Sequence, residues 1–576
     1  MSKMKIAVIP AAYGAARPLL MSTSGSFRER AAAWLANPHA RYLAAAFLAG
    51  AALRFWEVGG AILIDDEFHA IGAAQSYTFL GLFTHFGEAD HCIPLAMWYK
   101  FLIPWAGLGD WSVRLPMLLS SLVFCAAVPL LVYPAVRSSA LGWLIAIAPY
   151  HIFYSRYARP YSIAFLLGFL SVLALWRAIR SADRRWFCLA APCAILAPWF
   201  SLSFLPPLAA AGAAVSVWAC TARGRALRAA WAASFFTVLG GWCVLLLPPL
   251  LTDSAALYVK AGPKLVVAAA LPWLMELFTG VCDLRLGVLL VAAAAFGLFV
   301  LLRREPWLGL LLTLAAGAQF TASLATHPDN IVTAAMLGRY TLFIHALFLV
   351  SLAAAAARAV EACTGRLRKP AVAALALLCL GLFRAGPLPR LLELRPEWRS
   401  HGAFQGGYAW AKEGDFSRYG EKFRLKGFPP FYSALKKLPP GSVKLLEAPW
   451  HYASWLNPLP FYQAYHRQKN AIAFVGKVAG RGRGGEWPLE NINSRFSYFE
   501  ELGSAGFNTR ARADLLVIHK SWPAEQPDMP GLAGESEDMT RVLSFCRARY
   551  GPPSYEDALL SVFPLTAAAR ALPLAP

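Results

Sequence analysis

Apolar blocks of about 15–25 residues recur along the chain, separated by short polar segments. A helix needs roughly 20 apolar residues to cross a hydrocarbon core about 30 Å thick. Because lipid offers no hydrogen-bond partners, a spanning segment must satisfy its own backbone, as a helix does. Of the 576 residues, 58% are hydrophobic and 15% charged, and the mean hydropathy is +0.47. The pattern predicts a polytopic α-helical membrane protein and excludes a soluble domain of this size.

The distribution of basic residues predicts an orientation. With a cytoplasmic N-terminus, the Lys and Arg clusters fall in inner loops and most acidic residues fall in outer loops, as the positive-inside rule requires. The net charge of +21 therefore reflects membrane topology, and no nucleic-acid partner is expected. About eleven spans are expected, at about 42–58, 112–136, 139–154, 158–177, 186–200, 202–220, 229–251, 286–302, 307–325, 340–357 and 370–386. The segment Pro94–Leu108 is short and contains Lys100, so we expect it to lie against the outer membrane face.

Three regions follow from these expectations: a cytoplasmic segment 1–41, a transmembrane domain 42–386 with its first outer loop at 59–111, and a domain 387–576. The last region is polar and has β-like runs at Val443–Leu446, Ala471–Val475 and Asp514–Ile518. Helical patterns intervene at about Phe431–Leu438 and Ser494–Leu502. We therefore predict a small α/β domain, which the parity of the spans places on the extracytoplasmic side.

Carboxylates gather where the chain leaves its first predicted span. Asp65, Asp66 and Glu67 are consecutive, and His69 follows. Charged groups at a bilayer boundary are costly, which makes them candidates for a functional site. The alternative is that they only mark a helix end. Asp90 and His91 lie later in the same predicted outer loop.

Arginines fall on the same predicted face, against the inward bias of the other basic residues. Arg156, Arg159 and Tyr161 form one group, and Arg339 and Tyr340 form another. The planar guanidinium donates paired hydrogen bonds to phosphate and keeps its charge when partly desolvated. Headgroup anchoring by snorkelling is the alternative for these arginines.

A metal or nucleotide cofactor is not required by the sequence. His69, His85 and His91 lie near acidic residues, but no HExxH or HxxxH pair is present, so satisfied polar histidines are favoured and a divalent cation is the alternative. The ten cysteines form no CxxC pair and read as small buried hydrophobic residues. Gly476–Gly485 lacks phosphate-loop spacing and is expected to be a surface loop.

Five short motifs follow one another along the chain. They are Asp66-Glu67 before a helix, Asp90-His91-Cys92-Ile93-Pro94-Leu95, Arg114-Leu115-Pro116-Met117, Ser155-Arg156-Tyr157-Ala158-Arg159-Pro160-Tyr161-Ser162 and Arg339-Tyr340. In this order they resemble the motifs of the C-type (GT-C) glycosyltransferases related to protein O-mannosyltransferases and lipid A aminoarabinose transferases. The second motif resembles a His-Pro-Pro-Leu-like element whose inner positions are changed except for the final proline.

The resemblance implies transfer of a sugar from a polyprenyl-phosphate carrier to an extracytoplasmic acceptor (a lipid, glycan or protein) by an enzyme of the cell inner membrane. It implies Asp66 as general base with Glu67 in support, and an inverting displacement. Arg159 and Arg339 would contact the donor phosphate, with Arg156 and Arg114 as further candidates. The remaining substrate-binding candidates are Asp65, His69, Asp90, His91, Tyr161 and Tyr340.

Two other functions remain open at this point. A transporter or flippase of a lipid-linked or anionic substrate would be built from internal repeats with midplane charges. The two halves of this chain show no such repeat, and its charges gather at one face. A polysaccharide ligase or polymerase would share the lipid-linked donor but transfer whole oligosaccharides. Loss of turnover with retained donor binding in Asp66→Asn would favour the enzyme.

Overall fold

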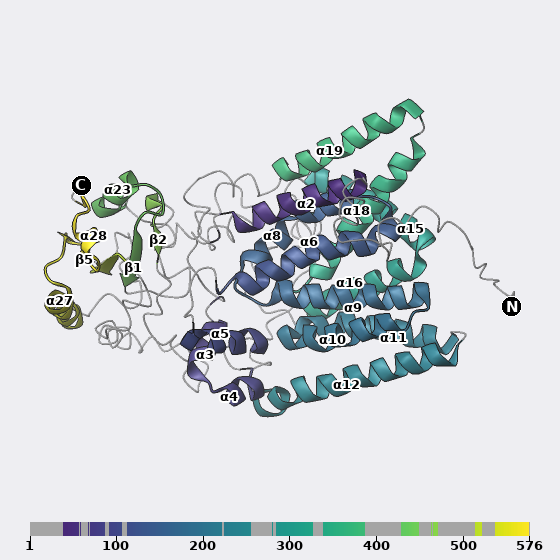
Figure 1. Cartoon of the computed structure of the whole chain (residues 1–576), viewed down its shortest axis with the longest axis horizontal. Coiled ribbons are helices and arrows are strands. Elements are labelled where there is room, and N and C mark those ends of the chain that lie inside the picture. Colours follow the sequence, from purple (N-terminus) through teal and green to yellow (C-terminus); the bar gives the residue numbers. More distant parts are fainter. Residues whose placement is uncertain are drawn as a thin grey trace, which may run out of the picture.

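The chain folds into a helical bundle with a small sheet beyond one end (Figure 1). The sheet belongs to an α/β domain near the C-terminus, so the protein is a polytopic α-helical membrane protein that carries such a domain. The computed structural model describes residues 38–56, 58, 67, 69–86, 92–105, 112–221, 224–254, 279, 284–325, 338–363, 365–385, 428–448, 462, 465–470, 513–520 and 536–574.

Every predicted span coincides with helical structure. Among the described residues, seven helical segments are long and apolar enough to cross a membrane: Leu115–Val136, Tyr161–Ser181, Leu202–Thr221, Arg225–Asp253, Arg285–Arg304, Pro306–Ala325 and Leu342–Ala362. The bundle helices are α2 (Pro38–Phe55), α6 (Leu115–Val136), α7 (Ala140–Ile147), α8 (Pro149–Arg156), α9 (Tyr161–Ser181), α10 (Arg185–Phe200), α11 (Leu205–Thr221), α12 (Arg225–Asp253), α15 (Leu284–Arg304), α16 (Pro306–Ala325), α18 (Leu342–Ala362) and α19 (Arg368–Ala385). Short 3₁₀ turns, η5 (Leu202–Phe204) and η6 (Gly365–Leu367), precede α11 and α19.

The predicted span 139–154 is broken into α7 and α8. Ala148 is extended, with φ −63° and ψ 114°, because the residue before a proline disfavours the helical region. The buried Arg54 of α2 supports the break by donating hydrogen bonds to the carbonyls of Ile145 and Ala146 at 3.3 and 3.2 Å. Its Nε also donates to Ser121 Oγ at 2.7 Å. A charged side chain inside the bundle thus satisfies carbonyl groups at the end of α7.

Helix α9 lies at the centre of the bundle and α12 at its edge. In the most apolar stretch of 18 residues of each helix, 72% of the residues are buried in α9 but only 11% in α12. Phenylalanines from α6, α9, η5 and α18 meet in the core around α9, with Phe124, Phe165, Phe169, Phe204 and Phe343 in mutual ring contact. Figure 1 shows α12 along the lower border of the bundle, outside α10 and α11.

Three helices of the predicted first outer loop pack together at the end of the bundle that faces the sheet (Figure 1): α3 (His69–Ser76), α4 (Phe79–Thr84) and α5 (Ile93–Trp105). They share a small core of their own with the start of α6. The phenol of Tyr99 donates a 2.7 Å hydrogen bond to the carbonyl of Val113, and Lys100 Nζ donates to the carbonyl of Ala74 at 3.0 Å. These contacts hold α5 against α3 and against the residues just before α6.

The elements of the C-terminal domain are α23 (Pro430–Lys437), β1 (Lys444–Ala448), β2 (Lys469–Asn470), β3 (Leu515–His519), α27 (Ser536–Tyr550), β4 (Tyr555–Glu556), β5 (Leu560–Pro564) and α28 (Ala567–Arg570). The sheet has the order β2-β1-β3-β5-β4. Strand β1 is parallel to β2 and β3, whereas β5 is antiparallel to β3 and β4. Strands β1 and β3 and helix α23 confirm three of the predicted runs, while Ala471–Val475, Gly476–Gly485 and Ser494–Leu502 lie outside the described residues.

Candidate active site

A buried ion pair connects the first outer loop to the bundle. Glu67 Oε1 lies 3.6 Å from Arg114 Nη2, and both side chains are fully buried. The same oxygen accepts a 2.8 Å hydrogen bond from the backbone N–H of Ala158, and Arg114 Nη1 donates to the carbonyl of Val58 at 3.2 Å. The carboxylate therefore ties together the start of α6 and the turn between α8 and α9.

Two arginines lie where α8 ends and α9 begins. Arg156 is the last residue of α8 and is 5% exposed, and Arg159 is fully buried. Tyr157, the residue after α8, is extended with φ −91° and ψ 123°, and this break separates α8 from α9, which follows Pro160. Arg159 donates from Nη2 to the hydroxyl of Tyr161 at 3.2 Å and from Nη1 to Cys92 Sγ at 3.7 Å.

Arg339 reaches the same place from the beginning of α18. Its guanidinium carbon lies 4.8 Å from the ring centre of Tyr340 and 5.9 Å from that of Tyr161, and the side chain is 7% exposed. The guanidinium of Arg159 lies 5.6 Å from the same Tyr161 ring. Two cations that share one aromatic neighbour concentrate positive charge in a buried region, and such a region suits an anion.

Gly338 allows the segment that carries Arg339 to pack closely against α8. A Cβ at this position would lie 3.1 Å from the ring of Tyr150 and 3.2 Å from the hydroxyl of Tyr154, both on α8. These contacts are tighter than most side chains tolerate, so a larger residue would push the Arg339 segment away from α8. The glycine before Arg339 therefore sets the distance between the start of α18 and the α8–α9 turn.

Tyr99 lies among these charged groups, although no motif singled it out. Burial raises the pKa of its phenol well above the usual value, and Cys92 and Glu67 reinforce the shift while Arg114 and Arg159 oppose it. The phenol is therefore neutral at physiological pH and serves as a hydrogen-bond donor. From sequence, Tyr99 is one aromatic residue in an apolar block, and its polar role depends on contacts across the fold.

The sequence-predicted residues fall into two sets. The first set lies at the end of the bundle against which α3 and α5 pack and consists of Glu67, Arg114, Arg156, Arg159, Tyr161, Arg339 and Tyr340. His69 is the first residue of α3. Asp65, Asp66, Asp90 and His91 lie outside the described residues, so their roles stay predictions. Within the described part of the chain, no group of three or more His, Cys, Asp or Glu side chains is arranged to hold a metal ion.

No protein-family model matches the chain, and no curated protein matches it by sequence. The solved structures that are similar to it include two of ArnT. The first is ArnT from Cupriavidus metallidurans bound to undecaprenyl phosphate, at 13% identity and a TM-score of 0.43, over 92% of this chain and 98% of that one. The second is ArnT from the same organism in the apo state, also at 13% identity and a TM-score of 0.43, over 94% and 99%.

Proposed function

We propose that the protein is a glycosyltransferase that moves a sugar from a polyprenyl-phosphate carrier to an extracytoplasmic acceptor. The observation that carries the proposal is the convergence of Arg159 and Arg339 on the ring of Tyr161 at one end of the bundle. A donor with a long hydrocarbon chain and a phosphate requires cations beside an apolar bundle, and these arginines provide them.

In the proposed reaction, the acceptor hydroxyl attacks the anomeric carbon of the sugar. A bond forms from that carbon to the acceptor oxygen, and the bond to the phosphate oxygen breaks. The carboxylate of Asp66 takes the hydroxyl proton, and polyprenyl phosphate leaves with the bonding electron pair. Arg159 and Arg339 stabilise the charge that develops on the departing phosphate. Direct displacement inverts the anomeric configuration.

Glu67 takes a positioning role in this proposal. Its carboxylate oxygen is engaged by Arg114 and by the N–H of Ala158, the residue before Arg159. Asp66 is its immediate neighbour in sequence, so the anchor at Glu67 restricts where the backbone of Asp66 can lie. One carboxylate would thus fix the loop that carries the base relative to the turn that carries a phosphate-binding arginine.

The site and the C-terminal domain are proposed to face away from the cytoplasm, with the domain shaping access of the acceptor. The distribution of basic residues supports this orientation. A reporter fused after Pro576 tests it: a reporter active only in oxidising, extracytoplasmic surroundings should give signal. Signal from a reporter that works only in the cytoplasm would contradict the orientation.

The function is tested with purified protein and a panel of polyprenyl-phosphate-linked sugars, by measuring release of polyprenyl phosphate. Asp66→Asn should abolish turnover while donor binding persists, because the amide cannot accept the proton. Glu361→Gln makes the same change of carboxylate to amide at an exposed position that pairs with Arg304, and this control should retain turnover. Turnover in Asp66→Asn close to that of the unaltered protein would refute the assignment of the base, and no release from any donor would refute the proposed reaction.

A further inference from the structure

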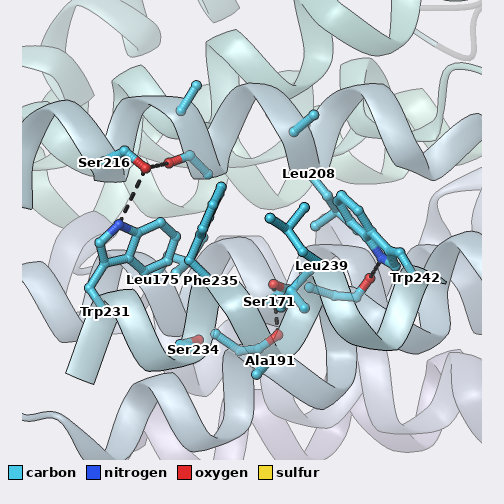
Figure 2. A pocket seen from close by; sticks show the side chains of 16 residues that line it. Ser171, Leu175, Ala191, Leu208, Ser216, Trp231, Ser234, Phe235, Leu239 and Trp242 are labelled. Atoms are coloured by element: carbon cyan, nitrogen blue, oxygen red, sulfur yellow. Dashed lines mark hydrogen bonds between the residues drawn. The ribbon is translucent and has the colours of Figure 1, made fainter. Parts of the chain in front are cut away.

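Helices α9, α10, α11 and α12 enclose a pocket of about 340 Å³ inside the bundle (Figure 2). Its wall includes Leu175 of α9, Leu208 of α11 and Phe235 of α12. Figure 2 shows Trp231 and Trp242 on opposite sides of the pocket, with Phe235 and Leu239 between them. The pocket therefore follows α12 for roughly 16 Å, the rise between its two tryptophans.

Four polar side chains in this wall, Ser171, Ser216, Trp231 and Trp242, form hydrogen bonds within the protein. Trp231 Nε1 donates to Ser216 Oγ at 3.3 Å, and Ser216 donates in turn to the carbonyl of Gly212 at 2.9 Å. Trp242 Nε1 donates to the carbonyl of Ala194 at 2.9 Å, and Ser171 Oγ to that of Ala190 at 3.1 Å. These bonds leave a largely hydrocarbon surface, which suits an apolar occupant better than water.

The pocket is separate from the candidate active site. Both involve α9, whose first residue, Tyr161, contacts Arg159 and Arg339. Ser171 and Leu175 line the pocket further along the same helix. With a rise of 1.5 Å per residue, they lie roughly 15–21 Å from Tyr161 along the helix axis, so a ligand of the pocket would not contact the arginine pair.

The pocket lies at the lipid-facing border of the bundle and near a basic end. Only 11% of the residues in the most apolar stretch of α12 are buried, so lipid can reach the pocket beside this helix. The rings of Phe187 and Trp231 lie 5.6 Å apart, which brings the N-terminal parts of α10 and α12 together. Exposed arginines occupy the first turns of these two helices and the residue before α10: Arg184, Arg185, Arg225 and Arg228.

We propose that this pocket binds one acyl chain of an anionic phospholipid. The chain lies between Trp231 and Trp242, and the phosphate lies beside the arginines at the starts of α10 and α12. The largely apolar lining and the exposure of α12 to lipid favour a hydrocarbon chain, and the arginines select the negative headgroup. The lipid belongs to the leaflet that these arginines face, not to the leaflet of the proposed sugar donor.

The inference is tested by native mass spectrometry of the full chain released from detergent, titrated with phosphatidylglycerol or phosphatidylcholine. The unaltered protein should retain one phosphatidylglycerol and prefer it to phosphatidylcholine. Gly212→Leu should reduce this adduct about tenfold, because the new side chain fills the volume that several methylene groups would occupy. A Cβ at Gly212 meets Trp231 only at 4.0 Å, so the site accepts a larger residue.

The matched control is Gly240→Leu, which makes the same change on α12 where a Cβ meets nothing within 4 Å. It should retain the lipid. If Gly212→Leu is poorly folded, Ala209→Phe provides a second filling variant from α11. Arg225→Gln combined with Arg228→Gln should remove the preference for phosphatidylglycerol while leaving an adduct. Equal retention in filled and control variants, an adduct with the mass of a polyprenyl phosphate, or a second copy of the chain in place of lipid would each overturn the proposal.

Discussion

The carboxylate of Glu67 lies 3.6 Å from the guanidinium of Arg114, and both side chains are fully buried. Such a pair contributes little net stability compared with an apolar pair of the same volume, because both charges lose their hydration. The ion pair instead fixes the relative position of parts of the chain. With the additional hydrogen bond from Ala158, the carboxylate of Glu67 contacts both the start of α6 and the turn between α8 and α9.

Replacement of Glu67 by Gln should destabilise the protein by about 3–5 kcal/mol, because Arg114 is left as an uncompensated buried charge. Turnover should fall as well, since the loop that carries Asp66 loses its anchor. Thermal unfolding and donor turnover, measured on the same preparation, check both effects. Glu361→Gln is the control: Glu361 pairs with Arg304 at an exposed site, where an ion pair contributes about 0–1 kcal/mol. Equal effects of the two substitutions would show that the Glu67 pair is dispensable.

Arg159→Lys and Arg339→Lys should each weaken use of the donor by about tenfold or more, because a lysine cannot reproduce the fork geometry of a guanidinium on phosphate. The effect is read from the dependence of initial rate on donor concentration. Arg303→Lys is the control, since Arg303 is exposed and lies over the ring of Phe299. Unchanged donor affinity and rate in both active-site variants would count against contact with the phosphate.

Hydropathy was enough to predict the bundle, because each span is identified by the length and apolarity of one continuous segment. It missed the division of 139–154 at Ala148, although Pro149 carried the signal, since apolarity does not report backbone conformation. Strand β5 was missed for a related reason. The run Leu560–Pro564 is short, and its place beside β3 comes from pairing across the sheet.

The candidate site was predicted in its residue types but not in its contacts. The arginine motifs identified Arg159 and Arg339, while their meeting at Tyr161 depends on the packing of α9 against α18. Glu67 appeared from sequence as a partner of Asp66. Its link to Arg114 and Ala158 is long-range, and no local pattern reports such a pairing.

Removal of divalent cations should leave turnover unchanged, because the proposed mechanism stabilises the leaving phosphate with guanidinium groups rather than with a metal. The measurement is donor turnover after treatment with a chelator and exchange into metal-free buffer. Re-addition of Mg²⁺ or Mn²⁺ is the control. A loss of activity that either ion restores would require a metal site and would remove the arginines as the sole stabilisers.

Arg54→Lys should lower the stability of the bundle by on the order of 2 kcal/mol. The guanidinium of Arg54 serves Ser121, Ile145 and Ala146 together, and an ammonium cannot reach all three acceptors, so buried carbonyls lose their donor. Thermal unfolding in detergent reports the change. Arg41→Lys makes the same substitution at an exposed position of α2 and should be neutral. A neutral Arg54→Lys would indicate that the α7–α8 break is stable without the guanidinium.

The C-terminal domain should lose stability as the pH falls below about 6.5. Burial lowers the pKa of His466 to about 4, against the opposing charge of Glu447. Because this folded-state pKa lies below the unfolded value of about 6.5, the stabilisation is complete above that pH and is lost as the pH falls toward 4. The loss amounts to at most about 3.4 kcal/mol.

Hydrogen exchange of the β3 amides in the full chain, corrected for the intrinsic rate at each pH, measures this effect. Glu447 adds to the loss at lower pH. Burial alone would raise its pKa, but the hydrogen bond and charge of His519 hold it below the usual value, so its contribution also disappears on acidification. In His466→Phe, protection should be lower at neutral pH, because the acceptor for the Gln468 N–H is lost. It should then depend less on pH between 6.5 and 4. An unaltered pH dependence in this variant would assign the acid sensitivity to another group.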